Sequence, residues 1–300
     1  MNSGLLHGLA AFGIWGLFPL YLRELASVPP LEVVVHRSVW SLLLLLVVMT
    51  LLRRWAWLRE LRHEPRKWFV FVASALLLSV NWLVYVWAIV NGHVLDASLG
   101  YFINPLVNVV LGVLVLRERL KPIQWLAVML AAAGVLWLTI DAGRVPWVAL
   151  TLAGSFGFYG LLRKTAPLGA LEGLTLETLV LAPLVLPLLV WFTLQPGGAM
   201  ARGDWTLNAL LMLGGPLTAL PLLLFAAAAR SLPLATVGLM QYIAPTIQFF
   251  LGITVFHEPM QAARLIGFAF IWTALAIYSG HAWWIARRLA AQVARQAPAA

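Results

Sequence analysis

Ten apolar blocks, separated by short polar segments, occupy almost the whole sequence. The hydrocarbon core of a bilayer is roughly 30 Å thick, and an apolar helix of about 20 residues crosses it. The blocks have about that length, and their bounds are Leu5–Leu22, Val33–Leu52, Trp68–Val90, Ala97–Leu116, Ile123–Ile140, Val145–Leu162, Leu174–Leu194, Leu207–Ala229, Ala235–Phe256 and Ala262–Ile285. With 62% of its 300 residues hydrophobic and 10% charged, the chain is far more apolar than a soluble domain. We therefore predict an all-α polytopic membrane protein with ten transmembrane helices.

The lysines and arginines gather in every second polar segment, and this alternation predicts an orientation. Fifteen of the 20 lie on one side of the predicted membrane, three on the other, and two just inside helix ends. Cytoplasmic loops are the ones enriched in Lys and Arg, so both termini are expected in the cytoplasm of a bacterial inner membrane, with 287–300 as a tail. The net charge of +9 is thereby explained without a nucleic-acid partner. The first block lacks the basic start of a signal peptide and is expected to be a retained helix.

A repeat relates the two halves of the sequence at a spacing of 140 residues. Seven of 24 positions are identical between Leu99–Pro122 and Leu239–Ala262, among them Pro105/Pro245 and Glu118/Glu258. Each half holds five helices, and an odd number makes the second half enter the membrane from the opposite side. We predict two inverted five-helix repeats, residues 1–143 and 144–286, an arrangement that many transporters share. A duplication retained only for packing is the competing interpretation.

Polar residues in the fourth block lie on one helix face near the middle of the predicted membrane. Tyr101, Asn104 and Asn108 follow the spacing of such a face, and the proline at 105 leaves a carbonyl one turn earlier without its donor. Gln241 and Gln248 repeat the pattern in the ninth block. The two faces are expected to be opposing walls of one cavity. Amides that merely join neighbouring helices are the alternative, which the sequence leaves open.

Aromatic residues and further amides in other blocks extend the predicted cavity. Such a mixture suits a small amphipathic ligand. Pro105 and Pro245 are expected to be hinges. Trp15 and Tyr85 are favoured as packing residues, although Trp15 is kept among the candidates. The candidate cavity residues are Trp15, Asn81, Trp82, Tyr101, Asn104, Asn108, Tyr159, Gln241, Tyr242 and Gln248.

Three ionisable residues, His36, Arg37 and Glu177, are expected inside predicted helices, where such residues are rare and commonly functional. Arg37 and Glu177 correspond in the repeat, but they lie near opposite ends of their helices, roughly 20 Å apart. We therefore expect separate partners, namely Glu258 or another outer acid for Arg37, and an Arg or Lys from the cytoplasmic side for Glu177. Structural charges that extend toward the membrane surface are the alternative.

Enzymatic chemistry finds little support in the sequence. The chain has no cysteine, its six histidines show no metal-binding spacing, and no phosphate-binding loop is present. No catalytic residue, metal site or cofactor is predicted.

Several stretches together resemble the EamA branch of the drug/metabolite transporter superfamily, and more narrowly its RarD-type permeases, a group associated with chloramphenicol sensitivity. The stretches are HRSVWS (36–41), NWLVYVWA (81–88), ASLGYFINPLVNVVLG (97–112), SFGFYGLLRK (155–164) and FAFIWTALAI (268–277). The resemblance implies ten helices in two inverted halves around a cavity lined mainly by helices one, three, four, six, eight and nine. Relatives handle diverse solutes, so the substrate stays open.

The leading hypothesis is a secondary transporter for a small metabolite or drug that works by alternating access. Its partners would be that solute and membrane lipid. A flippase for a lipid carrier or lipid-like solute is the second hypothesis, and a membrane-embedded enzyme is the third and weakest.

Overall fold

The computed structural model describes residues 3–58, 66–90, 94–141, 147–256, 265–278 and 280–281, and these residues form helices and short connections without a strand. The helices are α1 (Ser3–Glu24), α2 (Pro30–Leu51), α4 (Arg66–Val90), α5 (Val94–Leu114), α6 (Pro122–Asp141), α7 (Trp147–Thr165), α8 (Ala170–Leu194), the single 3₁₀ turn η1 (Met200–Arg202), α9 (Trp205–Ser231), α10 (Leu234–Met240) and α11 (Ile243–Thr254). A further apolar helix covers Leu265–Tyr278. The predicted tail, 287–300, lies outside the described residues.

The apolar blocks of the sequence coincide with these helices. Seven described helical segments are long and apolar enough to span a membrane, and Gly100–Leu114 and Leu265–Tyr278 are shorter apolar helices. Large apolar side chains are exposed on many of them, including Leu51 and Leu194, each 76% accessible. A soluble protein rarely exposes so much apolar surface, whereas lipid tails solvate it well. The prediction of an all-helical, multi-pass membrane protein is confirmed.

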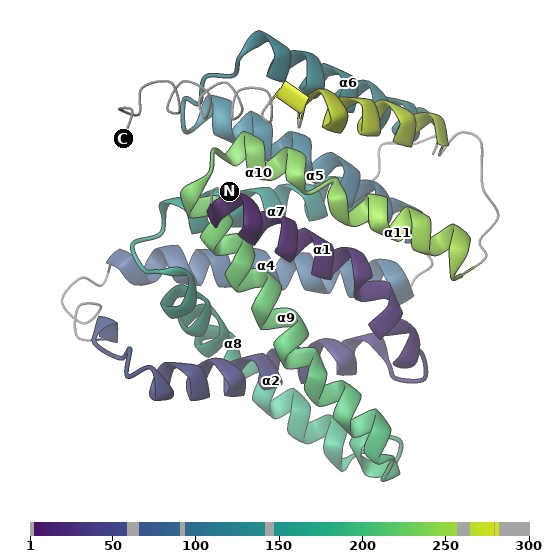
Figure 1. The fold of residues 1–300 in the computed structure, drawn as a ribbon. Coiled ribbons are helices and arrows are strands. Elements are labelled where there is room, and N and C mark those ends of the chain that lie inside the picture. The colour runs from purple at the N-terminus through teal and green to yellow at the C-terminus, as the bar shows by residue number, and fades with distance from the viewer. Residues whose placement is uncertain are drawn as a thin grey trace, which may run out of the picture.

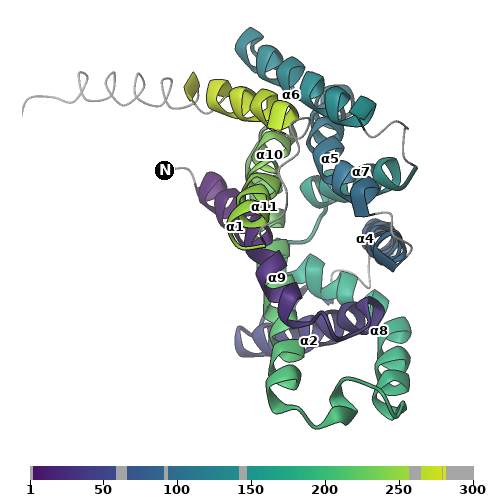
Figure 2. The same ribbon diagram turned by 90° about the vertical axis from the view of Figure 1, so that its right-hand side faces the viewer.

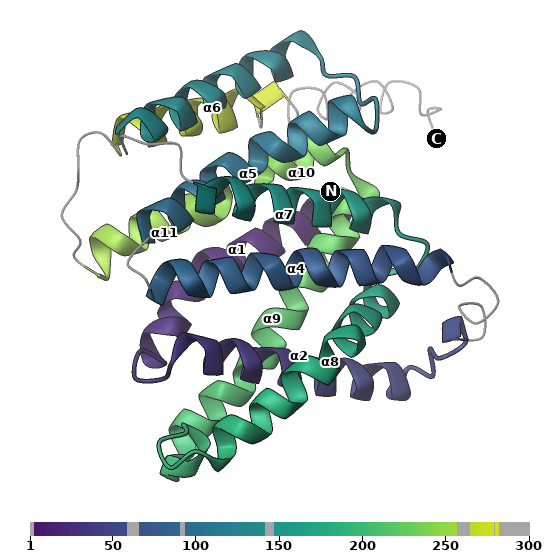
Figure 3. The same cartoon turned by 180° about the vertical axis from the view of Figure 1, so that it is seen from behind.

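Most helices run in roughly the same direction across the molecule (Figure 1). Helix α6 and the 265–278 helix lie side by side at one edge, and α2 and α8 lie at the opposite edge, in the views from the front and from behind (Figures 1 and 3). The view turned by 90° shows α4 nearly end-on and α1, α5 and α7 between these two edges, while α9 runs from the middle of the molecule to the edge that holds α2 and α8 (Figure 2). Helices α1, α5 and α7, together with part of α9, therefore surround the centre of the bundle.

The two largest of five apolar clusters in the described residues lie in this central region. One joins α1, α4, α7 and α9 through side chains such as Phe12, Tyr159 and Phe225. The other joins α5, α6, α10 and the 265–278 helix, where the ring centroids of Phe102 and Phe268 lie 5.1 Å apart. Burial of aromatic rings in tilted and edge-on pairs favours one packing over its alternatives. The central helices α5 and α10 thus have a packed support on their outer side.

The ninth apolar block is one span in the sequence but two helices in the structure. Helix α10 ends at Met240 and α11 begins at Ile243. Pro245 has no N–H to donate to the Gln241 carbonyl, which instead accepts from the Ala244 N–H at 3.3 Å. Pro105, its counterpart in the repeat, lies within the continuous helix α5. The chain is therefore interrupted one turn before Pro245, which places the polar side chain of Gln241 at a helix junction.

Candidate functional site

A cavity of about 230 Å³ lies between the central helices. Seven segments contribute to its wall: α1, α2, α4, α5, α7, α9 and the α10–α11 region. The wall consists of Phe12, Trp15, Phe18, Pro19, Leu22, Arg37, Leu78, Asn81, Trp82, Tyr85, Tyr101, Asn104, Phe156, Thr218, Leu222, Gln241, Ala244, Pro245 and Gln248. It is mainly aromatic and aliphatic, with a few polar groups, as is usual for small-molecule sites.

Most of the residues selected from the sequence lie on this wall. They are Trp15, Asn81, Trp82, Tyr101, Asn104, Gln241, Gln248, Pro245 and Arg37. Asn108, Tyr159, Tyr242, Pro105, His36 and Glu177 are described but do not line it. Tyr85, which the sequence favoured as a packing residue, does line it, with its ring 6.0 Å from that of Tyr101.

Two of the wall amides are held by neighbouring helices. Asn81 Nδ2 donates to the Leu152 carbonyl and to Ser155 Oγ, both at 3.0 Å, and so joins α4 to α7. Gln248 Nε2 donates to the Trp15 carbonyl at 3.1 Å, which joins α11 to α1. These bonds fix the side chains that face the cavity, so each amide contributes a defined surface to it.

Asn104 and Asn108 share a face of α5, as their spacing predicts, but their surroundings differ. Asn108 is fully buried and its Nδ2 donates to Gln241 Oε1 at 2.7 Å, so it joins α5 to the α10–α11 junction. Asn104 lines the cavity, and its buried Oδ1 has no hydrogen-bond partner among the described residues. A buried acceptor without a donor is costly. Asn104 therefore offers an acceptor to whatever occupies the cavity.

Tyr242, which lies at the α10–α11 junction next to Gln241, also joins the two predicted repeats. Its hydroxyl donates to the Phe102 carbonyl at 3.1 Å, and its side chain is fully buried. This contact holds the α10–α11 junction against α5 and leaves Tyr242 behind the cavity wall.

Arg37 is the charged residue of the cavity wall. Its Nε donates to Thr218 Oγ1 at 2.8 Å, and its guanidinium carbon lies 4.6 Å from the centre of the Phe18 ring. Gly214 of α9 makes room for it, since a Cβ there would lie 2.7 Å from Arg37 Cγ. The expected acidic partner Glu258 lies outside the described residues, and among those described no carboxylate lies within ion-pair distance of Arg37.

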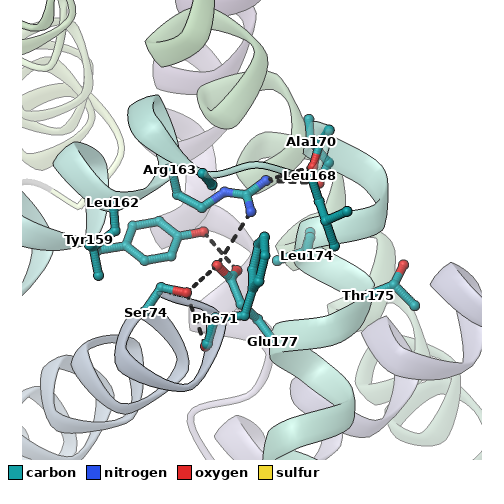
Figure 4. Close-up of polar contacts among 12 residues, drawn as sticks. Phe71, Ser74, Tyr159, Leu162, Arg163, Leu168, Ala170, Leu174, Thr175 and Glu177 are labelled. Atoms are coloured by element: carbon teal, nitrogen blue, oxygen red, sulfur yellow. Dashed lines mark hydrogen bonds and ion pairs between the residues drawn. The ribbon is translucent and has the colours of Figure 1, made fainter. Parts of the chain in front are cut away.

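Glu177 lies in a separate, fully buried cluster (Figure 4). Its carboxylate accepts from Ser74 Oγ at 2.5 Å and from Tyr159 Oη at 3.3 Å, and pairs with Arg163 Nη1 at 3.4 Å. The Arg163 Nη2 also donates to the carbonyls of residues 169 and 170. An arginine from a basic segment is thus the partner, as expected, and Tyr159 points toward this cluster instead of the cavity.

His36 is also buried away from the cavity. Its Nε2 lies 4.0 Å from Glu32, and its Nδ1 faces the indole N–H of Trp40 at 3.4 Å. The Glu32 carboxylate in turn accepts from the Ala199 N–H at 2.8 Å, which fastens α2 to the segment between α8 and α9. His36 and Glu177 therefore belong to different clusters.

Further charged residues bind the ends of α7 and α9 to one another. Lys164 Nζ donates to the carbonyls of Ala229 and Leu232 and lies 3.8 Å from Glu118. In the opposite direction, Arg230 Nη1 donates to the carbonyls of Ala166 and Leu168, both at 2.7 Å. We call these contacts, together with the Arg163–Glu177 pair, the α7–α9 clasp. Its hydrogen bonds and its Arg163–Glu177 pair lie within the second predicted repeat, beyond one end of the cavity, and the Lys164–Glu118 contact joins it to the first repeat.

Some wall residues were missed by the sequence reasoning. Phe12 and Phe18 lie three residues on either side of Trp15, so the helical spacing around that tryptophan could have indicated them. Phe156 precedes the chosen Tyr159 by three residues in the same way. Thr218 carries no comparable signal, because a threonine in an apolar helix commonly bonds only its own backbone.

Comparison with known proteins assigns a family to this architecture. The sequence pattern of the EamA-like transporter family matches residues 2–140. An uncharacterized transporter of Pseudomonas aeruginosa is 49% identical over 96% of this chain and 97% of its own. Protein RarD of Escherichia coli is 44% identical over 96% of this chain and 97% of its own. The chain is thus a multi-pass membrane protein of the transporter class. It belongs to the EamA-like transporter family, and its resemblance to RarD-type proteins is confirmed.

A more distant relative and a solved structure agree with this assignment. The chloramphenicol-sensitive protein RarD of Pseudomonas aeruginosa is 33% identical over 98% of each chain. A protein of known crystal structure shares the fold with a TM-score of 0.70 at 20% identity, over 92% of this chain and 96% of that one. The names of the relatives point to a transporter of small molecules and away from an enzyme.

Proposed function

We propose that the protein is a secondary transporter of a bacterial inner membrane, which moves a small amphipathic solute by alternating access through the cavity. The observation that carries this proposal is the composition of the wall, which draws on both halves of the chain, from Phe12 to Asn104 and from Phe156 to Gln248. A site between two repeats can be exposed to either side when the repeats rock against each other. The solute would contact the wall residues named above.

The helix contacts support the inverted relation of the halves, residues 1–143 and 144–286. Helix α4 contacts α7 and α8, and α9 contacts α1 and α2 in the corresponding way. Residues 140 positions apart can touch only near an axis that relates the repeats, and Tyr242 bonds to Phe102 at that spacing. The α5–α10 crossing is then the natural place for that axis.

The two ends of the cavity support alternating access. The wall follows α1 from Phe12 to Leu22, toward the connection between α1 and α2. At the other end, on the side where the basic segments predict the cytoplasm, contacts join the two halves: Glu118 accepts from the N–H groups of Leu234 and Ala235 and lies 3.8 Å from Lys164. We infer a conformation whose cytoplasmic side is closed. Pro245, beside the break between α10 and α11, and Pro105 in α5 would act as hinges when that side opens.

Site-directed cysteine labelling tests the proposal cleanly, because the chain has no cysteine of its own. Single cysteines at positions 85, 104 and 248 should react with membrane-impermeant maleimides in intact cells or liposomes. A cysteine at Leu184, which is 55% exposed midway along the apolar helix α8, is expected to face lipid; it is the control and should not react. Wall cysteines that stay unreactive from both sides in every condition would refute a water-accessible central site.

A flippase for a lipid-like solute is the alternative. It would need a wall that opens sideways to lipid, whereas residues from seven segments line this cavity. Flux of soluble solutes in liposomes without movement of labelled lipid would favour the transporter, and the reverse result would favour the flippase.

A further inference from the structure

Among the described residues, the cavity wall carries a single charge. Of the 19 described wall residues, Arg37 is the one with a side chain that is charged at neutral pH, and none of the 19 is Asp or Glu. Arg37 comes from α2, the second helix, which is not among the helices that the family resemblance names as the main lining of the cavity.

The protein provides hydrogen-bond acceptors for only part of the Arg37 guanidinium. A guanidinium has five N–H donors in a planar fork, and within the described residues only Nε donates a hydrogen bond, to Thr218. The Phe18 ring interacts with the cation through its face, and the Tyr21, Tyr85 and Tyr101 side chains are near enough to interact with it electrostatically, without a hydrogen bond to it. The terminal amino groups are left with the geometry that binds a carboxylate through two parallel hydrogen bonds.

The position of Arg37 is built into the packing. Its stem crosses α9 at Gly214, where a Cβ would approach both Arg37 Cγ at 2.7 Å and Tyr21 Oη at 2.5 Å. Tyr21 is itself held by the Leu210 carbonyl at 3.1 Å. The guanidinium is thus oriented before any solute arrives, which reduces the entropy lost on binding.

The rest of the wall restricts the solute further. Aromatic rings dominate, with Trp15 and Phe156 at 5.9 Å and Tyr85 beside Tyr101. Asn104 Oδ1 is a buried acceptor without a donor. An ammonium group on the solute would find no carboxylate among the described wall residues, and a dianion would exceed the single positive charge of Arg37.

We propose that the cavity takes an organic monoanion whose carboxylate binds the Arg37 guanidinium and whose apolar body lies among the aromatic rings. An N–H or O–H of the same solute donates to Asn104. This inference rests on the proposed transport function, and it adds that the solute carries a net negative charge, in contrast to neutral, zwitterionic or cationic solutes.

A matched series of probes tests the charge preference on the full-length protein in detergent. The probes are indole-3-acetate, indole-3-acetamide and tryptamine, which share an aromatic body and a ring N–H, with binding measured by equilibrium dialysis. The unmodified protein should bind the carboxylate about tenfold or more tightly than the amide, since charge-assisted bonds are roughly twice as strong as neutral ones. Tryptamine should bind most weakly. Equal or reversed preference overturns the proposal, and so does a failure to bind any of the three.

Variants then assign the preference to one residue. Arg37→Gln should abolish the carboxylate preference and change amide binding by less than about threefold, while Arg37→Lys should keep part of it because the charge remains but the fork is lost. Arg202→Gln is the matched control, since Arg202 is an exposed arginine outside the wall. A preference that persists in Arg37→Gln overturns the proposal. The comparison of probes on the unmodified protein decides the matter even if that variant does not fold.

A failure of the monoanion proposal can be distinguished from a failure of the transport proposal. Cavity cysteines that react with aqueous reagents, combined with equal binding of the carboxylate and the amide, would leave transport standing and remove the monoanion. Unreactive cavity cysteines would remove the transport site itself.

Discussion

Arg37 and Arg163 are both held inside the helical bundle, but the protein surrounds them in different ways. Arg163 is fully buried, pairs with Glu177 at 3.4 Å and donates to the carbonyls of Gly169 and Ala170, at the start of α8. Arg37 lies on the cavity wall and donates one hydrogen bond, to Thr218. The first guanidinium is neutralised by the fold, and the second keeps its charge and most of its donors available.

We infer from this difference that Arg163 is a structural cation and that Arg37 is available to bind a ligand. Desolvation of a charge is compensated only when a counter-charge and hydrogen bonds replace the lost water. Glu177, Ser74 and Tyr159 supply that replacement in the α7–α9 clasp. In the cavity, water or a solute must supply it. The two sites should therefore respond in opposite ways when a partner is removed.

The largest effect on stability is expected at Glu177. Glu177→Gln leaves Arg163 charged, buried and unpaired, and should lower the free energy of unfolding by about 3–5 kcal/mol. Thermal unfolding of the purified protein in detergent measures it. The double variant Arg163→Met with Glu177→Leu should regain most of the loss, because it removes both charges together. A single variant as stable as the original protein would show that the pair contributes nothing.

Gly173 tests how closely the clasp is packed. A Cβ at this position would collide with the Arg163 guanidinium and lie 2.8 Å from the Phe71 ring. Gly173→Ala should therefore destabilise the protein by about 1–3 kcal/mol through overpacking. Gly154→Ala on α7 is the matched control, since nothing lies within 4 Å of its Cβ. The control should be neutral or stabilising by up to about 1 kcal/mol, because alanine favours helix more than glycine does.

The two amides of α5 also differ in that one is paired within the protein and the other faces the cavity, with smaller energies than for the arginines. Asn108 is paired with Gln241, whereas Asn104 faces the cavity. A double-mutant cycle of Asn108→Ala and Gln241→Ala should give a coupling of about 0.6 kcal/mol, the usual size for such bonds in membrane proteins. A cycle of Asn104→Ala and Gln241→Ala should give none. Equal couplings would contradict the assignment of Asn108 to structure and Asn104 to the cavity.

The helices were largely predictable, because apolar length is a local property of the sequence. The break in the ninth span was less so. The sequence indicates that Pro245 frees the Gln241 carbonyl, but it does not say whether the helix bends or stops there. Helix α5 continues through Pro105, whereas the helix of the ninth span stops at Gln241, one turn before Pro245. The interactions on either side of each proline decide the outcome, and those interactions are tertiary.

The site was predictable as a set of helix faces and not as a set of contacts. Spacing places Asn104 and Asn108 on one face, yet that face meets both the cavity and the α10–α11 junction. Tyr159 lies three residues from Phe156 but turns toward Glu177. Periodicity fixes which side of its own helix a residue occupies, whereas the neighbour opposite depends on how the helices cross.

The smallest effect on stability is expected at Arg37, where the effect on function should be large. Arg37→Gln removes one hydrogen bond to Thr218, which contributes about 0.5–1.5 kcal/mol, and also removes an unpaired charge whose burial opposes folding. The two changes offset each other, so the free energy of unfolding should stay within about 1 kcal/mol of the original value. Uptake or efflux of an anionic solute by proteoliposomes should fall at the same time by about tenfold or more. Stability that drops as far as it does in Glu177→Gln would show that Arg37 has a structural counter-charge after all, and the contrast between the two arginines would disappear.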